Sequence, residues 1–167
     1  EQKVGDFYAS GMDTMAIEKI GYDPLKDMLA KIDAAKDYKE LVNLMAEGKK
    51  TGFNSLIGTY VGADEKNSAK NLLSLVQTGL NMPEKEYYTR KDSITEAQRQ
   101  QLVKLATQYF VLTGMEKVAA EKAGADVLKI ETAIAASHLL PVELRDPIKN
   151  YNKYAVADLE KMAPNLS

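Results

Sequence analysis

The sequence predicts a mostly α-helical fold: an irregular domain of about seven helices with one small two-stranded β-hairpin. Over much of the chain, apolar residues recur at intervals of three and four, which places them on one face of a helix. Asp-Pro pairs and glycines stand where these segments would begin and end. With 167 residues, 45% of them hydrophobic, the chain can bury one core, so we expect a single domain over residues 1–167.

Two helical segments are expected at the start of the chain. The apolar face of the first consists of Val4, Phe7, Tyr8 and Met12. Asp13 is placed to cap a second segment over residues 14–20, because its carboxylate can accept from the free N–H groups of a first turn. Gly21 follows that segment, where glycine commonly ends a helix.

Two further helical segments are expected before residue 50. Asp23 and Pro24 form an N-cap and first-turn pair that begins one of them. Its apolar face consists of Leu25, Met28, Leu29 and Ile32. Asp37 and Glu40 have the spacing of a capping box, with Asp in the capping role. The helix behind that box is expected to end near Gly48.

The middle of the chain predicts the hairpin. Residues 56–61 and 72–77 are short apolar runs separated by a polar turn at residues 64–67, a pattern that favours two antiparallel strands. Residues 78–88 are expected to be irregular, since glycine and Pro83 interrupt them.

Helical spacing returns in the last third of the chain. One helix is expected from residue 94 to the glycine at 114, and the next from about residue 116 to 139, where Pro141 ends it. The pair Asp146-Pro147 begins a short helix. Residues 156–162 form the last.

Charge and composition exclude several classes of function. The chain carries 22 Lys and Arg against 24 Asp and Glu, and no basic patch has interleaved aromatic residues, so we expect no nucleic-acid partner. The absence of cysteine excludes disulfides and thiolate chemistry. No apolar run approaches the ~20 residues that span a bilayer, so we expect no membrane insertion in this segment. The chain begins without Met or a signal-peptide pattern, which suggests a processed or excised piece.

The one histidine, His138, is the first candidate for chemistry. It shares an apolar helical stripe with Val127, Ile130 and Ile134, which favours a core imidazole with one hydrogen-bonded partner over a proton carrier. Glu131 lies two turns earlier, roughly 10 Å away, too far for the two to hold one metal ion.

The acidic residues of the same helix form the second candidate. They are Glu116, Glu121, Asp126 and Glu131, and Lys117, Lys122 and Lys129 alternate with them. This pattern favours a solvated helix face over a pair of acids for general acid–base catalysis. Glycine-rich phosphate loops are absent from the sequence. We therefore predict no catalytic, cofactor-binding or metal-binding residue in this chain.

Four segments, in order along the chain, resemble a known family. Lys3-Val4-Gly5-Asp6-Phe7-Tyr8-Ala9-Ser10-Gly11-Met12-Asp13 comes first, followed by Ala16-Ile17-Glu18. Asp64-Glu65-Lys66-Asn67-Ser68 and the run from Gln77 through Gly79-Leu80 and Pro83 to Tyr87-Tyr88 come next. Arg145-Asp146-Pro147 and Tyr151-Asn152-Lys153 close the series. Together they resemble the non-catalytic N-terminal part of the neprilysin and endothelin-converting-enzyme family of zinc metallopeptidases.

The resemblance implies where the chemistry of the parent protein lies. The family's later lobe carries H-E-x-x-H, in which two histidines bind zinc and the glutamate acts as general base. One histidine cannot supply that motif, so this chain alone is not expected to be an enzyme. Gly11 stands where animal members often have cysteine, which suggests a bacterial, disulfide-free member.

The resemblance also implies a role for this piece. It would form part of the helical cap that encloses the peptide-binding cavity and limits substrate size. Its partners would be the catalytic lobe of the same polypeptide, which holds the zinc, and the parent's peptide substrates. The family implies an extracytoplasmic location, whether periplasmic, surface-anchored or secreted. The alternatives are a free-standing helical protein-binding module derived from such a lobe and a purely structural or storage protein.

Overall fold

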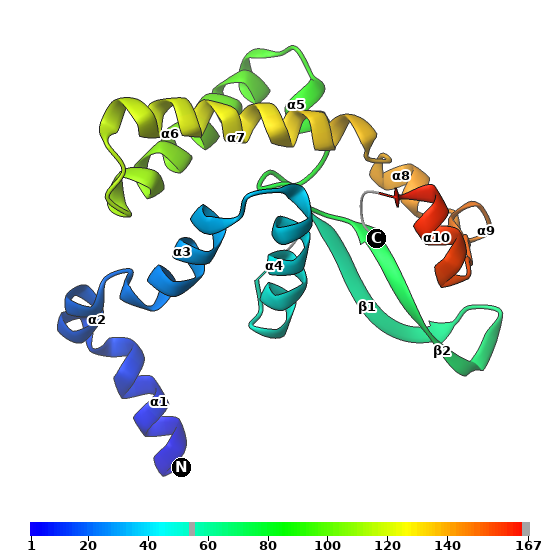
Figure 1. Ribbon diagram of the computed structural model, residues 1–167, viewed down its shortest axis with the longest axis horizontal. Coiled ribbons are helices and arrows are strands. Elements are labelled where there is room, and N and C mark those ends of the chain that lie inside the picture. Colours follow the sequence, from blue (N-terminus) through cyan, green and yellow to red (C-terminus); the bar gives the residue numbers. More distant parts are fainter. Residues whose placement is uncertain (54–55, 165–167) are drawn as a thin grey trace. The chain divides into compact units, whose positions relative to one another are not determined.

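The computed structural model describes residues 1–53 and 56–164 and is built mainly of helices (Figure 1). The α-helices are α1 (Gln2–Met12), α2 (Thr14–Ile20), α3 (Lys26–Ala34), α4 (Tyr38–Lys50), α5 (Glu86–Thr89), α6 (Ser93–Leu112), α7 (Lys117–Ser137), α8 (Pro141–Leu144), α9 (Pro147–Asn150) and α10 (Val156–Met162). Strands β1 (Ile57–Asp64) and β2 (Asn67–Gln77) form one antiparallel hairpin. The mostly α-helical fold class with a single small hairpin is confirmed.

The chain divides into two compact units, Glu1–Leu44 and Met45–Ser167. Two such units can belong to one domain, so the single domain expected over residues 1–167 stays a prediction. Residues 54–55 and 165–167 of that range lie outside the described residues.

Helices α2 and α3 of the first unit begin at or near the residues that were expected to cap them. The Asp13 carboxylate accepts from the N–H of Ala16 at 3.0 Å and begins α2, as expected. The helix expected from Pro24 instead begins at Lys26, after a 3₁₀ turn over Asp23–Leu25. The Asp23 carboxylate pairs with the Lys26 ammonium at 2.6 Å.

The hairpin has the predicted pairing and is longer than predicted. Ile57 lies opposite Gln77 and Val61 opposite Leu73, so the two apolar runs do face each other. Pairing continues to Asp64 opposite Asn67, which leaves only two residues in the turn. The Asp64 carboxylate accepts from the N–H of Lys66 at 3.0 Å and closes that turn.

Helices α6 and α7 pack as an antiparallel pair (Figure 1). Gly114, at φ 95°, ends the first helical segment in the left-handed conformation that glycine adopts without strain. Gly124 of α7 lies close against α6, because a Cβ there would lie 2.8 Å from the carbonyl oxygen of Val103 and against the Thr107 side chain. Glycine at that position lets the two backbones come together.

Helix α7 ends earlier than expected. The prediction that it runs to residue 139 with His138 on its apolar face is wrong, since the helix ends at Ser137 and His138 is extended. The cause is Pro141, which disfavours helical backbone at the preceding Leu140, and that residue is extended too. Pro141 itself begins α8. Both α8 and α5 are one-turn helices, and the sequence pattern indicated neither of them.

The core of the second unit lies between α5, α6 and α7. Tyr88, Leu102 and Ala135 are buried there. Partly buried apolar residues pack around them, namely Leu80, Met82, Tyr87 and Leu128. Among the described residues, no helix has both the length and the apolar character needed to cross a membrane.

Candidate functional site

A cavity of about 720 Å³ lies where the segment after β2 meets the end of α7. It is lined by Met45, Leu56, Gln77, Thr78, Gly79, Leu80, Asn81, Met82, Pro83, Glu84, Glu131, His138, Leu139, Pro141 and Leu144. Most of this wall is apolar, and a few polar groups converge on it. That combination is typical of a binding pocket.

Glu131 is the most connected polar group of the wall. It is only 6% exposed. Its carboxylate accepts from the hydroxyl of Tyr88 at 2.5 Å, from the N–H of Asn81 at 3.0 Å and from the side-chain amide of Asn81. Three donors therefore satisfy a carboxylate that burial would otherwise penalise. We call Asn81, Tyr88 and Glu131 the Glu131 cluster.

The prediction that the acidic residues of α7 form a solvated face is wrong for Glu131. Glu116, Glu121 and Asp126 are exposed as expected, whereas Glu131 is buried. The reason is that Glu131 lies on the inward stripe of the helix. Gly124, Leu128, Glu131 and Ala135 form that stripe, at intervals of three and four. This spacing was a signal in the sequence that could have placed Glu131 inside.

The Tyr88 hydroxyl has a fixed protonation state. Burial, together with the hydrogen bond to Glu131, raises the pKa of Tyr88 well above its ordinary value of 10.0. The hydroxyl thus stays protonated, donates to Glu131 and accepts from the N–H of Met82 at 2.9 Å. Tyr88 ties the segment before α5 to helix α7.

Two further side chains fix the end of α7. Gln77 exchanges two hydrogen bonds with the backbone of Leu139, at 3.1 and 2.9 Å. The Lys85 ammonium donates to the carbonyls of Ala136 and His138, both at 3.0 Å. These are carbonyls that the helix end leaves without partners. The wall of the cavity is therefore held at both of its edges.

His138 lies in this wall and is 9% exposed. Its predicted burial is confirmed, but it follows α7 and does not share the stripe of that helix. The hydrogen-bonded partner expected for its imidazole is not found among the residues that the structure describes.

A second polar cluster joins the tip of the hairpin to the segment after α9. The buried Asp64 carboxylate accepts from the Tyr151 hydroxyl at 2.8 Å and pairs with the Lys153 ammonium at 2.7 Å. The Lys66 ammonium lies 4.1 Å from the centre of the Tyr151 ring, a cation–π contact. Lys153 and the N–H of Lys66, with Tyr151, lower the pKa of Asp64 to about 2. We call Asp64, Tyr151 and Lys153 the Asp64 cluster.

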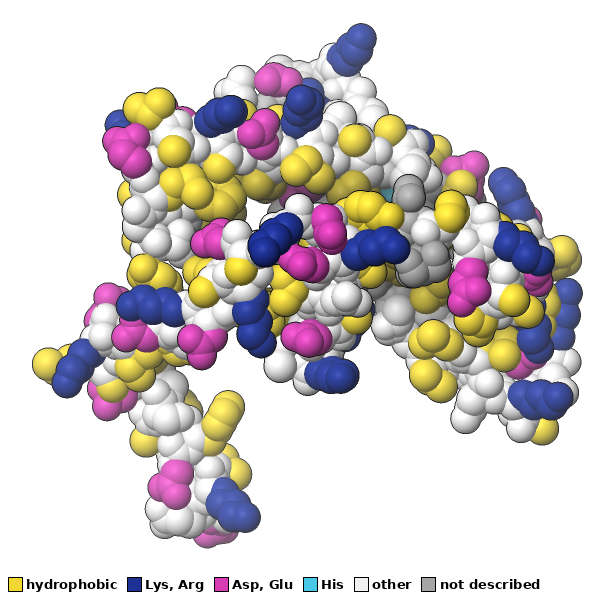
Figure 2. Space-filling model, in the orientation of Figure 1, with side chains coloured by type: hydrophobic (Ala, Val, Ile, Leu, Met, Phe, Trp, Pro, Cys, Tyr) yellow, Lys and Arg dark blue, Asp and Glu magenta, His cyan; other side chains and the backbone are white. Residues whose placement is uncertain are grey.

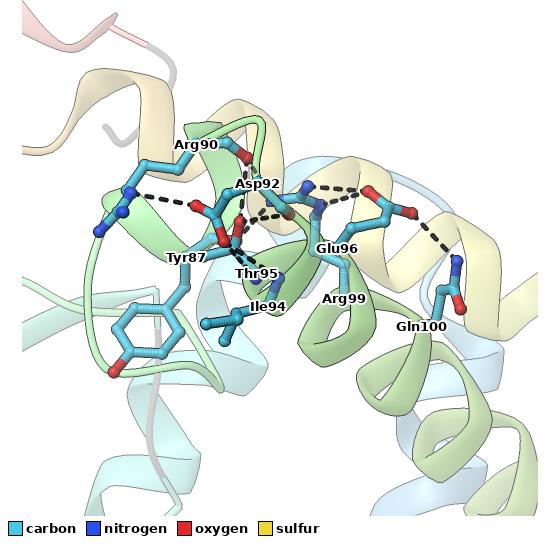
Figure 3. A network of polar contacts seen from close by, with 8 residues as sticks. All are labelled: Tyr87, Arg90, Asp92, Ile94, Thr95, Glu96, Arg99 and Gln100. Atoms are coloured by element: carbon cyan, nitrogen blue, oxygen red, sulfur yellow. Dashed lines mark hydrogen bonds and ion pairs between the residues drawn. The ribbon is translucent and has the colours of Figure 1, made fainter.

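A third network joins α5 to the start of α6 (Figure 3). The Arg99 guanidinium donates to the carbonyls of Tyr87 and Arg90, at 2.8 and 3.0 Å, and pairs with Glu96 at 2.8 Å. Arg99 lowers the pKa of Glu96 through the hydrogen bond between them. Asp92 caps α6, and the N–H of Thr95 lowers the pKa of Asp92.

The contacts of these groups bind and position neighbouring segments of the chain. Within residues 1–53 and 56–164, no three His, Cys, Asp or Glu side chains come together as a metal site would require. The carboxylates of Glu131 and Asp64 are each engaged by several donors. Each carboxylate therefore holds the segments that it binds in position.

Comparison with known proteins decides the family. The family model described as Peptidase family M13 matches residues 1–167. This chain belongs to peptidase family M13. The resemblance predicted from the four sequence segments is thereby confirmed, and the chain corresponds to the N-terminal region of the neprilysin and endothelin-converting-enzyme family.

Individual M13 relatives are similar in sequence to this chain over its whole length. Endothelin-converting enzyme 1 of Cavia porcellus is 26% identical over all of this chain and 23% of its own length. Neprilysin-3 of Drosophila melanogaster is 27% identical over all of this chain and 22% of its own length. The M13 chain thus spans less than a quarter of these relatives.

Solved structures have the same fold. The zinc metalloprotease Zmp1 of Mycobacterium tuberculosis, in complex with an inhibitor, matches with a TM-score of 0.86 and 31% identity, over 95% of this chain and 24% of its own. PepO of Lactobacillus rhamnosis matches with a TM-score of 0.76 over 89% of this chain and 24% of its own. At 18% identity, that second likeness shows the fold alone.

Two of the polar clusters explain why the family segments have these residues. The Asp64 cluster brings the second segment, at the hairpin turn, against the last, at residues 151–153. The Glu131 cluster fixes the third, residues 77–88, against α7. Three of the four sequence segments that carry the M13 resemblance therefore take part in the contacts of the second unit.

Proposed function

We propose that this chain is part of the helical cap of an M13 zinc endopeptidase. The cap encloses the peptide-binding cavity of the parent protein and admits peptides of limited size, while the catalytic residues lie in another lobe. The observation that carries the proposal is the extent of the family match. M13 relatives align with 95–100% of this chain, yet the alignment covers only 22–24% of their own lengths.

The apolar surface of the first unit supports this proposal. Helices α1 and α2 have no buried residue, and their large apolar side chains are exposed (Figure 2). Among them are Val4, Phe7, Tyr8, Met12 and Met15. An apolar stripe of this kind is the face by which a helix packs on another part of a protein. The remaining lobe of the parent is the partner that family membership offers.

Zinc and catalysis are assigned to the rest of the parent. An H-E-x-x-H helix there would bind zinc through two histidines and use its glutamate as general base, and a further glutamate would complete the metal site. Closure of the two lobes would exclude water and bulky substrates from the reaction. We further propose that the parent is a bacterial protein and, on family membership alone, that it acts outside the cytoplasm.

The source gene provides the test. An H-E-x-x-H a few hundred codons downstream and an export signal upstream are expected. The purified 167-residue chain should hydrolyse no peptide, with or without added zinc. A stop codon just after residue 167 would replace the proposal with a free-standing helical binding module. Chelator-sensitive hydrolysis by the chain alone would overturn the assignment of catalysis to another lobe.

A further inference from the structure

The three helices at the start of the chain lack the burial that usually keeps a helix folded. They are α1, α2 and α3, of 11, 7 and 9 residues. None of residues 1–44 is buried, and Phe7 and Met15 are 81% and 85% exposed. Most helical stability in proteins comes from packing an apolar face, and an isolated helix shorter than about 12–15 residues is marginal in water.

Two of the hydrogen bonds that shape α1 and α2 act within a single turn. The Gln2 side-chain amide donates to the Asp6 carboxylate at 2.8 Å. The Asp13 carboxylate accepts from the N–H of Ala16 at 3.0 Å. Bonds of this kind favour the helical conformation of a few neighbouring residues. Because they are exposed to water, they add little to its stability.

The second unit has the opposite character. Helices α6 and α7, of 20 and 21 residues, pack with α5 around Tyr88, Leu102 and Ala135. The Glu131 carboxylate binds Asn81 and Tyr88, which lie 43 to 50 positions earlier in the chain. Unfolding any one of these helices would expose the core and break these hydrogen bonds together. We therefore expect α5, α6 and α7 to unfold as one cooperative body.

The boundary between the two units lies inside α4, between Leu44 and Met45. Gly48, in the second half of that helix, is buried. Its carbonyl oxygen accepts from the N–H groups of Thr51 and Phe53, at 3.0 and 2.9 Å. This half of α4 is therefore held within the second unit, and the helices without such support are α1, α2 and α3.

We infer that α1, α2 and α3 of this chain unfold and refold locally while the second unit stays folded. Few buried apolar contacts and exposed backbone hydrogen bonds are the features of segments that open at low free energy. The inference does not depend on the proposed cap role, since it follows from the burial of residues 1–44 alone. Order in residues 2–34 can therefore change without any change in the core.

Hydrogen–deuterium exchange of the 167-residue chain, measured by mass spectrometry, tests this inference. Amides in residues 2–34 are expected to exchange within about tenfold of the rate for an unstructured peptide. Amides in α6 and α7 are expected to exchange at least about 100-fold more slowly than that. Equal protection of α1, α2 and α3 with α6 and α7 would overturn the inference. Unprotected exchange in every helix would overturn it too, because the second unit would then have no separate fold.

Two substitutions test whether the two parts are independent. Leu102→Ala removes a core side chain that is 8% exposed, so it should lower the protection of α6 and α7 by at least about tenfold, or abolish it. Exchange in residues 2–34 should stay unchanged in either case. Gly5→Ala in α1, where a Cβ meets nothing within 4 Å, should slow exchange in α1 by about two- to fivefold and leave α6 and α7 unchanged. An effect of Leu102→Ala on α1, or of Gly5→Ala on α7, would show a single cooperative fold and contradict the inference.

Discussion

Glu131 shows how one buried carboxylate can organise a large part of the second unit. It lies on α7 and binds the backbone and side chain of Asn81 and the hydroxyl of Tyr88, residues 43 to 50 positions earlier in the chain. The segment between β2 and α5 has little regular structure of its own. Its conformation therefore depends on hydrogen bonds to a charged acceptor, which are stronger than those to neutral groups.

Replacing this acceptor tests its contribution. Glu131→Gln substitutes a neutral amide and places N–H donors opposite the donors of Asn81 and Tyr88. We expect the free energy of unfolding to fall by about 1–3 kcal/mol. Denaturant titration measures the change, with Glu121→Gln, an exposed position on the same helix, as a control expected within about 0.5 kcal/mol of the unchanged chain. Equal effects of the two substitutions would mean that the cluster contributes nothing specific.

The Asp64 cluster predicts how stability depends on pH. The carboxyl has an ordinary pKa of 3.8, which folding lowers to about 2, so its charged form is favoured in the folded state. Its contribution to stability is therefore complete above about pH 4 and is lost as the pH falls through 2. Unfolding midpoints measured between pH 5 and pH 2 should fall, and Asp64→Asn should flatten this dependence. A slope that survives Asp64→Asn would assign it to other carboxyls.

The roles of some single residues can be predicted from the sequence, and those of others cannot. Asp13, Asp37 and Asp146 act as caps as predicted, because capping depends on neighbours within three residues. The environment of Glu131 depends on residues about fifty positions away. The alternation of acids with lysines predicted that Glu131 is exposed, and only the inward stripe of α7 indicated that it is buried. Asp23 does not cap α3, which begins only after the 3₁₀ turn over Asp23–Leu25.

Among the elements, the pairing of α6 with α7 depends on one small residue. Gly124→Ala adds a methyl group 2.8 Å from the carbonyl oxygen of Val103 and against the Thr107 side chain, so the helices must separate. We expect a loss of about 1–3 kcal/mol of unfolding free energy, despite the better helix propensity of alanine. Gly11→Ala in α1, where a Cβ meets nothing within 4 Å, is the matched control. It should gain roughly 0.5–1 kcal/mol of helix stability, and a gain at both positions would contradict the packing described.

The boundaries of helices and strands also depend partly on neighbouring residues and partly on distant ones. Helices α2 and α10 have the predicted bounds, and the hairpin has the predicted partners. The Asp13 cap marks α2 in the sequence, and a polar turn marks the hairpin. The end of α7 differs because Pro141 acts on Leu140 and because Gln77 and Lys85 bind the chain beyond the helix. One-turn helices such as α5 are too short to show a period.

For the molecule as a whole, the proposed cap role predicts that the exposed stripe of α1 packs on the proposed catalytic lobe. Phe7 is 81% exposed, so Phe7→Ser should change the unfolding free energy of the 167-residue chain by less than about 0.5 kcal/mol. In the full-length protein the same change should remove a buried contact worth about 1.5–3 kcal/mol and lower the melting temperature. Lys3→Ser, on the same helix, should leave both unchanged. A Phe7 that is equally neutral in both contexts would leave the stripe without a partner.

The proposed function is that this chain caps a peptidase chamber. The most direct test is the rate at which the full-length protein cleaves one scissile sequence embedded in peptides of increasing length and in a folded protein. We predict rapid, chelator-sensitive cleavage of the short peptides, a steep fall as length increases, and no cleavage of the folded protein. Rates that do not depend on substrate size would contradict a cap that limits entry.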